Sequence, residues 1–186
     1  MRKVFGVIGA IALLITVSAC TPDGGQTADP TSSAIQTPDA SLIPPAPGAD
    51  VKAVDSSLYD VGFSEFLFRA GEGPTWCTIN ADENWALCEQ NEASATYKPV
   101  TPPADCEYSY GYQIKLYSTT PDNGQTAGFV CASGYYTDGS AAATLNSGEK
   151  ITVGDITCYV AEVVARCDNK NGQYIALGSN IWAAKN

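Results

Sequence analysis

Seven cysteines are the residues of this chain with the clearest chemistry, and their number and spacing restrict what they can do. Cys20 follows an apolar N-terminal segment, and the other six lie between residues 77 and 167. Six is an even number, which suits three disulfide bonds formed in an oxidising compartment. The chain has no C-x-x-C pair and no histidine, so we expect no zinc site, no other metal and no cofactor.

Catalysis would have to use carboxylates, because a chain without histidine cannot form a Ser-His-Asp or Cys-His arrangement. Two facing carboxylates cleave glycosidic bonds in many enzymes. The candidate pairs are Asp82 with Glu83 and Glu89 with Glu92, and both occur in polar, turn-like stretches that favour a solvated surface. We therefore predict no catalytic residues, and a carboxylate-based hydrolase is the least favoured alternative.

Aromatic residues are the better candidates for a ligand site. An exposed ring can stack on a sugar or anchor a protein interface, because a flat amphipathic side chain buries a large area at a small entropy cost. Tyr135 and Tyr136 precede a predicted turn at 138–139 and are the best loop candidates for contact. The alternative for each aromatic residue is a place in the core. The candidate binding residues are Trp76, Trp85, Tyr135, Tyr136 and Trp182.

Short strands must position these residues. Over 106–117 the side chains alternate between apolar and polar, which predicts a strand with one core-facing side. That side would consist of Tyr108, Tyr110, Tyr112, Ile114 and Leu116. A turn over 121–124, a return strand over 126–132 and a last strand over 174–177 are also expected. The predicted fold is all-β: a small, disulfide-stapled antiparallel sandwich or barrel.

Two stretches share a pattern of strand, short connection and strand, with a cysteine on each arm. The cysteines are 11 residues apart in the stretch 77–88 and 9 apart in the stretch 158–167. An odd separation places both cysteines opposite each other across a hairpin with an even-numbered loop, where a disulfide fits. Six cysteines allow fifteen pairings, and the sequence does not choose among them. The expected disulfides are Cys77–Cys88, Cys158–Cys167 and, from the remaining pair, Cys106–Cys131.

The N-terminus begins with positive charges, continues with an apolar run and ends in small residues before Cys20, which is typical of a secretory signal peptide. The sequence Val17-Ser18-Ala19-Cys20 resembles the lipobox of bacterial lipoproteins. This resemblance implies that the signal peptide, residues 1–19, is removed and that Cys20 receives a diacylglyceryl group, with palmitate as a typical fatty acid. Two acyl chains hold a protein on a membrane stably. The alternative, a secreted protein cut after Ala19, would leave Cys20 as an odd, unpaired thiol.

Residues 20–57 are rich in Pro, Thr, Ser and Asp and contain no aromatic residue. We therefore expect a disordered tether between the membrane and a domain over 58–186. Cleavage after residue 19 removes Arg2 and Lys3 from the 10 basic residues and none of the 20 acidic ones, which leaves a net charge of −12. Such a charge argues against nucleic acid as a partner and against electrostatic binding of anionic lipid.

Two cysteine-bearing strand pairs, followed by the ending Asp-Asn-Lys-Asn-Gly-Gln-Tyr-Ile-Ala-Leu over 168–177, occur within residues 63–183. This arrangement resembles small cysteine-hairpin domains of exported actinobacterial proteins of unknown function, and the resemblance implies no catalytic residue. With the anchor and the tether, we expect a lipid-anchored protein on the extracytoplasmic face of the cell membrane. Its β domain would bind an envelope protein or glycan without catalysis. The alternative is an inhibitor of an exported enzyme.

Overall fold

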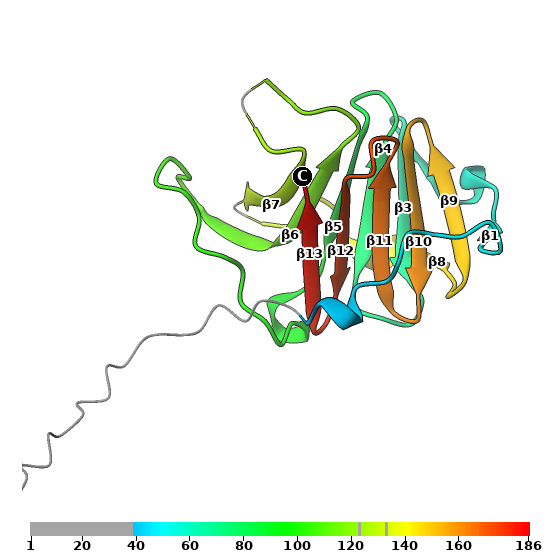
Figure 1. The fold of residues 1–186 in the computed structure, drawn as a ribbon, viewed down its shortest axis with the longest axis horizontal. Helices are drawn as coiled ribbons and strands as arrows, with labels where there is room; N and C mark the ends of the chain where they lie inside the picture. Colours follow the sequence, from blue (N-terminus) through cyan, green and yellow to red (C-terminus); the bar gives the residue numbers. More distant parts are fainter. Residues whose placement is uncertain (1–38, 123, 133) are drawn as a thin grey trace, which may run out of the picture. The chain divides into compact units, whose positions relative to one another are not determined.

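The structure is a computed structural model that describes residues 39–122, 124–132 and 134–186. These residues form two β-sheets that pack face to face, with no α-helix in the described ranges (Figure 1). The fold is all-β and sandwich-like, as predicted, and the described strands do not close into a barrel. Cys20, the lipobox and residues 20–38 of the predicted tether lie outside the described residues. The short 3-10 helices are η1 (Ala40–Leu42), η2 (Ser56–Tyr59), η3 (Glu92–Ser94) and η4 (Gly139–Ala141).

Sheet A has six strands and is antiparallel except where β1 pairs with β9. The strand expected over 174–177 is β12, and the following strand, β13, was not predicted. In spatial order the strands are β1 (Lys52–Ala53), β9 (Glu149–Val153), β10 (Ile156–Ala161), β11 (Val164–Asn169), β12 (Tyr174–Gly178) and β13 (Ile181–Lys185).

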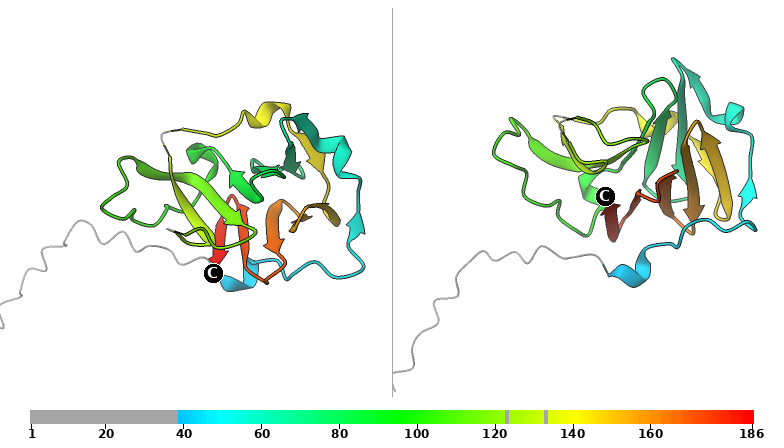
Figure 2. Two further views of the ribbon diagram at one scale, coloured as in Figure 1. Left: turned by 90° about the horizontal axis from the view of Figure 1, so that it is seen from above. Right: turned by 45° about the horizontal axis from the view of Figure 1, so that its top comes forward.

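Sheet B contains the strands predicted around the first two cysteine pairs, and Figure 2 shows from two further sides how it faces sheet A. In spatial order its strands are β2 (Asp60–Gly62), β3 (Glu65–Ala70), β4 (Trp76–Asn80), β5 (Trp85–Glu89), β6 (Ser109–Tyr117) and β7 (Ala127–Ala132). A further strand, β8 (Ala143–Leu145), pairs in parallel with β3.

Three disulfides staple neighbouring segments, and they are the three expected pairs. Cys77 faces Cys88 across β4 and β5, and Cys158 faces Cys167 across β10 and β11, with Cα–Cα distances of 4.1 and 4.0 Å. Both bridges are fully buried between the sheets, where Cys88 Sγ lies 3.9 Å from Cys167 Sγ. The third bridge, Cys106–Cys131, lies at the surface. The core of the sandwich is therefore built around two stacked disulfides.

Both cysteine hairpins turn without the Asn-Gly sequence of an ideal tight turn. Each instead places one non-glycine residue in the left-handed region, Asn84 at φ 54° and Glu162 at φ 55°. Asparagine tolerates this conformation well, and for glutamate it is less favourable. The cross-strand disulfide and the paired strands fix the register of each hairpin, so a less suitable turn residue is tolerated.

The apolar side predicted for the strand over 106–117 is confirmed in its second half and wrong at its start. Tyr112, Ile114 and Leu116 belong to the core. Tyr108 precedes β6 and is 58% exposed. A register shift against β7 lies between Tyr110 and Ile114, and such a bulge breaks the two-residue alternation on which the prediction rested.

Residues 39–57 lie against the sandwich, so the predicted tether of residues 20–57 is wrong over its last part. Pro44 is buried, and its carbonyl accepts a hydrogen bond of 2.5 Å from the guanidinium of Arg166. Further along, β1 adds to sheet A, and Lys52 Nζ lies 2.8 Å from a carboxylate oxygen of Glu149. A polar, proline-containing segment can therefore be ordered by a few contacts that its composition does not reveal.

Candidate functional site

The outer face of sheet B holds the side chains that form the candidate site. Strand alternation sends the cysteines of β4 and β5 into the core and sends Trp76, Trp85 and Glu89 to the opposite face. An outer sheet face commonly meets water, yet these three residues are at most 4% exposed. The segment that covers them leads from β7 to β8. It consists of residues 134–142, and we call it the crossover segment.

Hydrogen bonds hold the crossover segment on the sheet at its first residue and again in its second half. Gln113 Nε2 on β6 donates to the carbonyl of Gly134 at 2.7 Å, and the guanidinium of Arg69 on β3 donates to the carbonyl of Gly139. Gly139 also lies directly on the indole of Trp76, where an added Cβ would be 2.3 Å from a ring atom. Only glycine allows this close approach. At this position the backbone of the crossover segment, and not a side chain, packs against the Trp76 ring.

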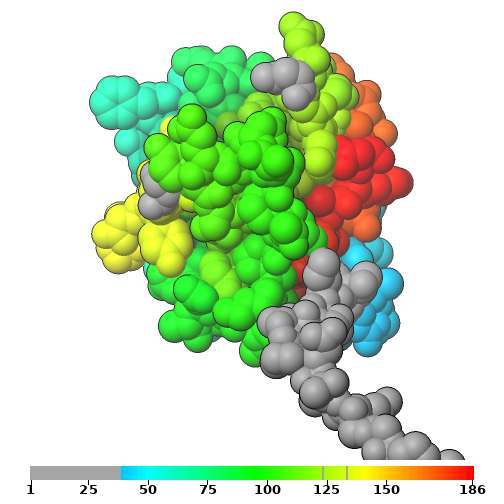
Figure 3. All heavy atoms as spheres, turned by 90° about the vertical axis from the view of Figure 1, so that its left-hand side faces the viewer, coloured from blue at the N-terminus to red at the C-terminus, as the bar shows by residue number. Residues whose placement is uncertain are grey.

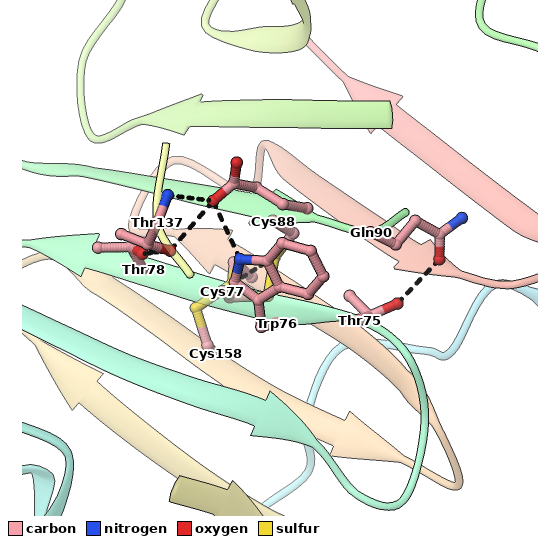
Figure 4. Close-up of a disulfide and its surroundings, with 10 residues drawn as sticks. Thr75, Trp76, Cys77, Thr78, Cys88, Gln90, Thr137 and Cys158 are labelled. Atoms are coloured by element: carbon pink, nitrogen blue, oxygen red, sulfur yellow. Dashed lines mark hydrogen bonds between the residues drawn. A yellow bond between two sulfur atoms is a disulfide. The ribbon is translucent and has the colours of Figure 1, made fainter. Parts of the chain in front are cut away.

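Glu89 lies at the centre of this packing, fully buried, and accepts five hydrogen bonds. One carboxylate oxygen accepts from Gln113 Nε2 and from the backbone N of Tyr136, both at 2.6 Å. The other accepts from Trp76 Nε1 at 3.2 Å and from the N and Oγ1 of Thr137 at 3.3 and 3.2 Å (Figure 4). Burial raises the pKa of the Glu89 carboxyl, and the hydrogen bonds from Tyr136, Thr137 and Trp76 oppose that rise.

The prediction that Glu89 lies on a solvated surface is wrong, because β5 continues through this residue and the crossover segment covers it. Its proposed partner Glu92 is exposed and forms an ion pair with Lys98 at 3.2 Å. Asp82 and Glu83 are exposed, as expected. Enclosed by protein donors, Glu89 is suited to positioning the crossover segment.

Tyr135 and Tyr136 project from the crossover segment with 51% and 49% of their surface exposed. The rings of Tyr135 and Trp76 pack in a T-shaped arrangement with centroids 5.5 Å apart, and those of Tyr136 and Trp85 do the same at 5.2 Å. The Tyr136 hydroxyl donates to the carboxylate of Glu65. Four of the predicted binding residues therefore lie together. The buried indoles of the two tryptophans pack beneath the two exposed tyrosine rings and fix their positions.

Trp182 does not belong to this group. It lies on β13 of sheet A and packs against Phe129 of β7, with ring centroids 4.8 Å apart. The residue that the sequence analysis missed is Lys115, whose Nζ lies 4.0 Å from the centroid of the Trp85 ring. Burial lowers the pKa of Lys115, and nearby Glu83 opposes this shift. The alternation of β6 placed Lys115 on the outer face, but no sequence signal showed that this face is covered.

Three hollows in the surface have Tyr135 in their lining, with volumes of about 620, 460 and 350 Å³. Tyr136 lines the largest and the smallest of them. Other residues that line these two hollows are Arg69, Trp76, Asp138, Tyr108 and Lys115. We call the exposed tyrosines of this region, Tyr108, Tyr135 and Tyr136, the tyrosine surface. It offers aromatic rings beside both polar and charged groups.

Comparisons with protein-family models, with curated proteins and with solved structures give no significant match for the chain. In the described part of the chain, no helix has the length and apolar character needed to cross a bilayer. A close group of potential metal ligands there consists of Cys77, Cys88 and Cys167, and all three sulfurs are in disulfides. Oxidised sulfur is not the thiolate that binds a metal.

Proposed function

We propose that this chain is a lipid-anchored protein on the extracytoplasmic face of the cell membrane, and that its domain binds an envelope glycan without catalysis. The lipobox-like sequence at residues 17–20 supports the anchor. Three disulfides support export, because such bonds persist in oxidising compartments.

The observation that carries the binding proposal is that Tyr135 and Tyr136 are half exposed and yet firmly held. The backbone N of Tyr136 and that of Thr137 donate to Glu89, and the rings of Tyr135 and Tyr136 pack against the buried indoles. A ring that is already ordered loses little entropy when a ligand stacks on it. Sugar rings present flat C–H faces and hydroxyl edges, which suit hollows lined by tyrosines and by polar side chains.

Retention on isolated cell wall tests the binding. We expect Tyr135→Ala to weaken retention of the mature protein about tenfold, equivalent to about 1.4 kcal/mol. The matched control is Val163→Ala, which truncates an apolar residue that is 40% exposed on the β10–β11 turn of sheet A. Equal retention of the Tyr135 variant and the wild type, or no retention of either, would contradict glycan binding at the tyrosine surface.

The intact mass of the protein purified from its membrane tests the anchor. We expect a chain that begins at Cys20 and carries the added mass of a diacylglyceryl group, and a Cys20→Ala variant that leaves the membrane fraction. A mature species that begins with an unmodified Cys20, or a protein that keeps its leader inside the cell, is the opposite result. The intact mass tests only the lipid anchor, and retention on cell wall tests only glycan binding. A negative result for one therefore does not affect the test of the other.

A further inference from the structure

Phe63 is the most exposed large apolar residue in the described part of the chain, at 95% exposure. It lies in the turn between β2 and β3, at the edge of sheet B. Leu58 and Val61 shortly before it are 71% and 48% exposed. In Figure 3 the turquoise part of the chain, which includes this turn, projects at the upper left. A phenylalanine ring in water at a projecting turn contributes no burial to the fold.

The backbone of this turn is also unfavourable for the residues that it contains. Gly62, Phe63 and Ser64 have φ values of 87°, 55° and 59°, so three successive residues are left-handed. Glycine accepts this conformation freely, whereas a phenylalanine there is an outlier. The sequence thus places a large ring where the fold alone would favour glycine or asparagine.

Hydrogen bonds hold the turn in this conformation. The N of Gly62 donates to an Asp60 carboxylate oxygen at 2.7 Å, and Ser64 Oγ donates to an Asp82 carboxylate oxygen at 2.8 Å. The carbonyl of Ser64 accepts from the N of Ala81 at 2.8 Å. The turn is therefore braced against the β4–β5 hairpin, and Phe63 is presented at a defined position.

The charged residues of this turn and of the hairpin end that braces it are acidic, and the nearest cation of the neighbouring strand is the largely covered Lys115, close to Glu83. Asp60, Asp82 and Glu83 are exposed beside it or in the hairpin that braces it. The sequence has no Lys or Arg over 53–68 or 70–97. An apolar tip within acidic surroundings is repelled by an anionic lipid surface and is attracted to a basic one.

We propose that the turn over residues 62–64, which we call the Phe63 tip, is a docking element for a partner protein. Phe63 would enter an apolar pocket of the partner, and Lys or Arg side chains at the rim of that pocket would face Asp60 and Asp82. A buried aromatic anchor with charges at its rim is the usual anatomy of an interface hot spot. A pre-ordered tip reduces the entropy lost on binding. This proposal does not depend on the glycan site, because it uses different residues and a different class of ligand.

Site-specific photocrosslinking tests the proposal with the full chain in the cells that make it. A benzoylphenylalanine at position 63 is expected to give a discrete adduct with one protein, through a peptide that lies in an apolar pocket with Lys or Arg at its rim. Asp60→Asn with Asp82→Asn keeps the oxygen acceptors of the turn and removes both charges. We expect this double variant to reduce the adduct about fivefold at unchanged fold, the effect of two lost rim pairs.

The control is the same photoreactive residue at Val163, which we expect to give no such adduct. The proposal is overturned by crosslinks to lipid alone, by crosslinks between copies of this chain, or by the absence of a protein adduct. A protein adduct that is insensitive to the two charge changes also overturns it, because the basic rim is then absent. Circular dichroism of Phe63→Gly is expected to show a melting temperature equal to or above that of the wild type, which verifies that Phe63 does not serve the fold.

Discussion

Replacing Glu89 by alanine is expected to lower the free energy of unfolding by about 3–5 kcal/mol. The substitution removes the acceptor of five hydrogen bonds and leaves buried donors of Trp76, Gln113 and the crossover segment without a partner. Each buried donor that loses its partner costs about 1–3 kcal/mol, and partial relaxation of the segment reduces the sum. Denaturant unfolding followed by tryptophan fluorescence measures this loss.

Two further variants make the measurement specific. Glu89→Gln keeps the shape but directs an N–H₂ group at donors, so we expect an intermediate loss of about 1–3 kcal/mol. Glu72→Ala removes an exposed carboxylate from another loop and should change stability by less than about 0.5 kcal/mol. A Glu89→Ala variant as stable as the Glu72 variant would show that the carboxylate does not hold the crossover segment.

The pH dependence of stability offers a second readout for Glu89. Because burial raises its pKa above the ordinary value of 4.5, the native protein keeps a proton that the unfolded chain has released. The contribution of this group to stability is therefore largest in acid and is lost as the pH rises from 4.5 through the native pKa. The difference in unfolding free energy between wild type and Glu89→Gln should change over this window and be constant above it.

Removing the disulfide of the second hairpin is the other substitution with a large expected effect. The double variant Cys158→Ala, Cys167→Ala is expected to lose about 2–5 kcal/mol of stability, since the bridge constrains the unfolded chain and its sulfurs fill the core. Thermal unfolding of the oxidised protein measures the loss. An unchanged melting temperature would mean that the bridge is dispensable.

The single variant Cys158→Ala should behave differently from the double one. It leaves the Cys167 thiol beside Cys88, where the sulfurs lie 3.9 Å apart in the native protein. During oxidative folding the Cys167 thiolate can attack Cys88, form a Cys88–Cys167 bond and release the Cys77 thiolate. Peptide mapping should detect this exchange in Cys158→Ala and not in Cys106→Ala, whose free Cys131 lies at the surface.

The cysteine hairpins could be predicted from the sequence because their information is local. An odd separation and an apolar arm on each side of a short connection define which residues face each other, and the register Cys77↔Cys88 and Cys158↔Cys167 agrees with it. The core half of β6 was predictable for the same reason, since alternation in a regular strand needs no knowledge of distant segments.

The candidate site could be predicted only in part because it depends on what covers the sheet. The sequence indicated Tyr135 and Tyr136 as exposed loop residues, and this is confirmed. It did not show that the loop returns across the outer face of sheet B and buries Trp76, Trp85 and Glu89. In the sequence, Glu89 is followed by polar residues and therefore resembles a surface carboxylate. Its buried position becomes evident only from the hydrogen-bond donors that surround it in the fold.

The edge strands of sheet A, β1 and β13, also could not be predicted from the sequence, because each depends on its partner strand. β1 consists of two residues in a polar segment and is specified by the pairing Lys52↔Glu149, close to one hundred residues away in the sequence. β13 is specified by its partner β12, which it meets through a tight connection at Gly178 and Ile181. Neither strand has enough alternation of its own to be recognised alone.

The three disulfide loops follow one another along the chain, and none encloses or overlaps another. A single backbone cleavage within 89–105 or 132–157 would therefore give two fragments with no covalent link. Only non-covalent pairing, such as that of β3 with β8, would keep the halves together. The crossover segment lies inside one of these intervals, so we expect its hydrogen bonds to Glu89 to determine how readily a protease can separate the two halves.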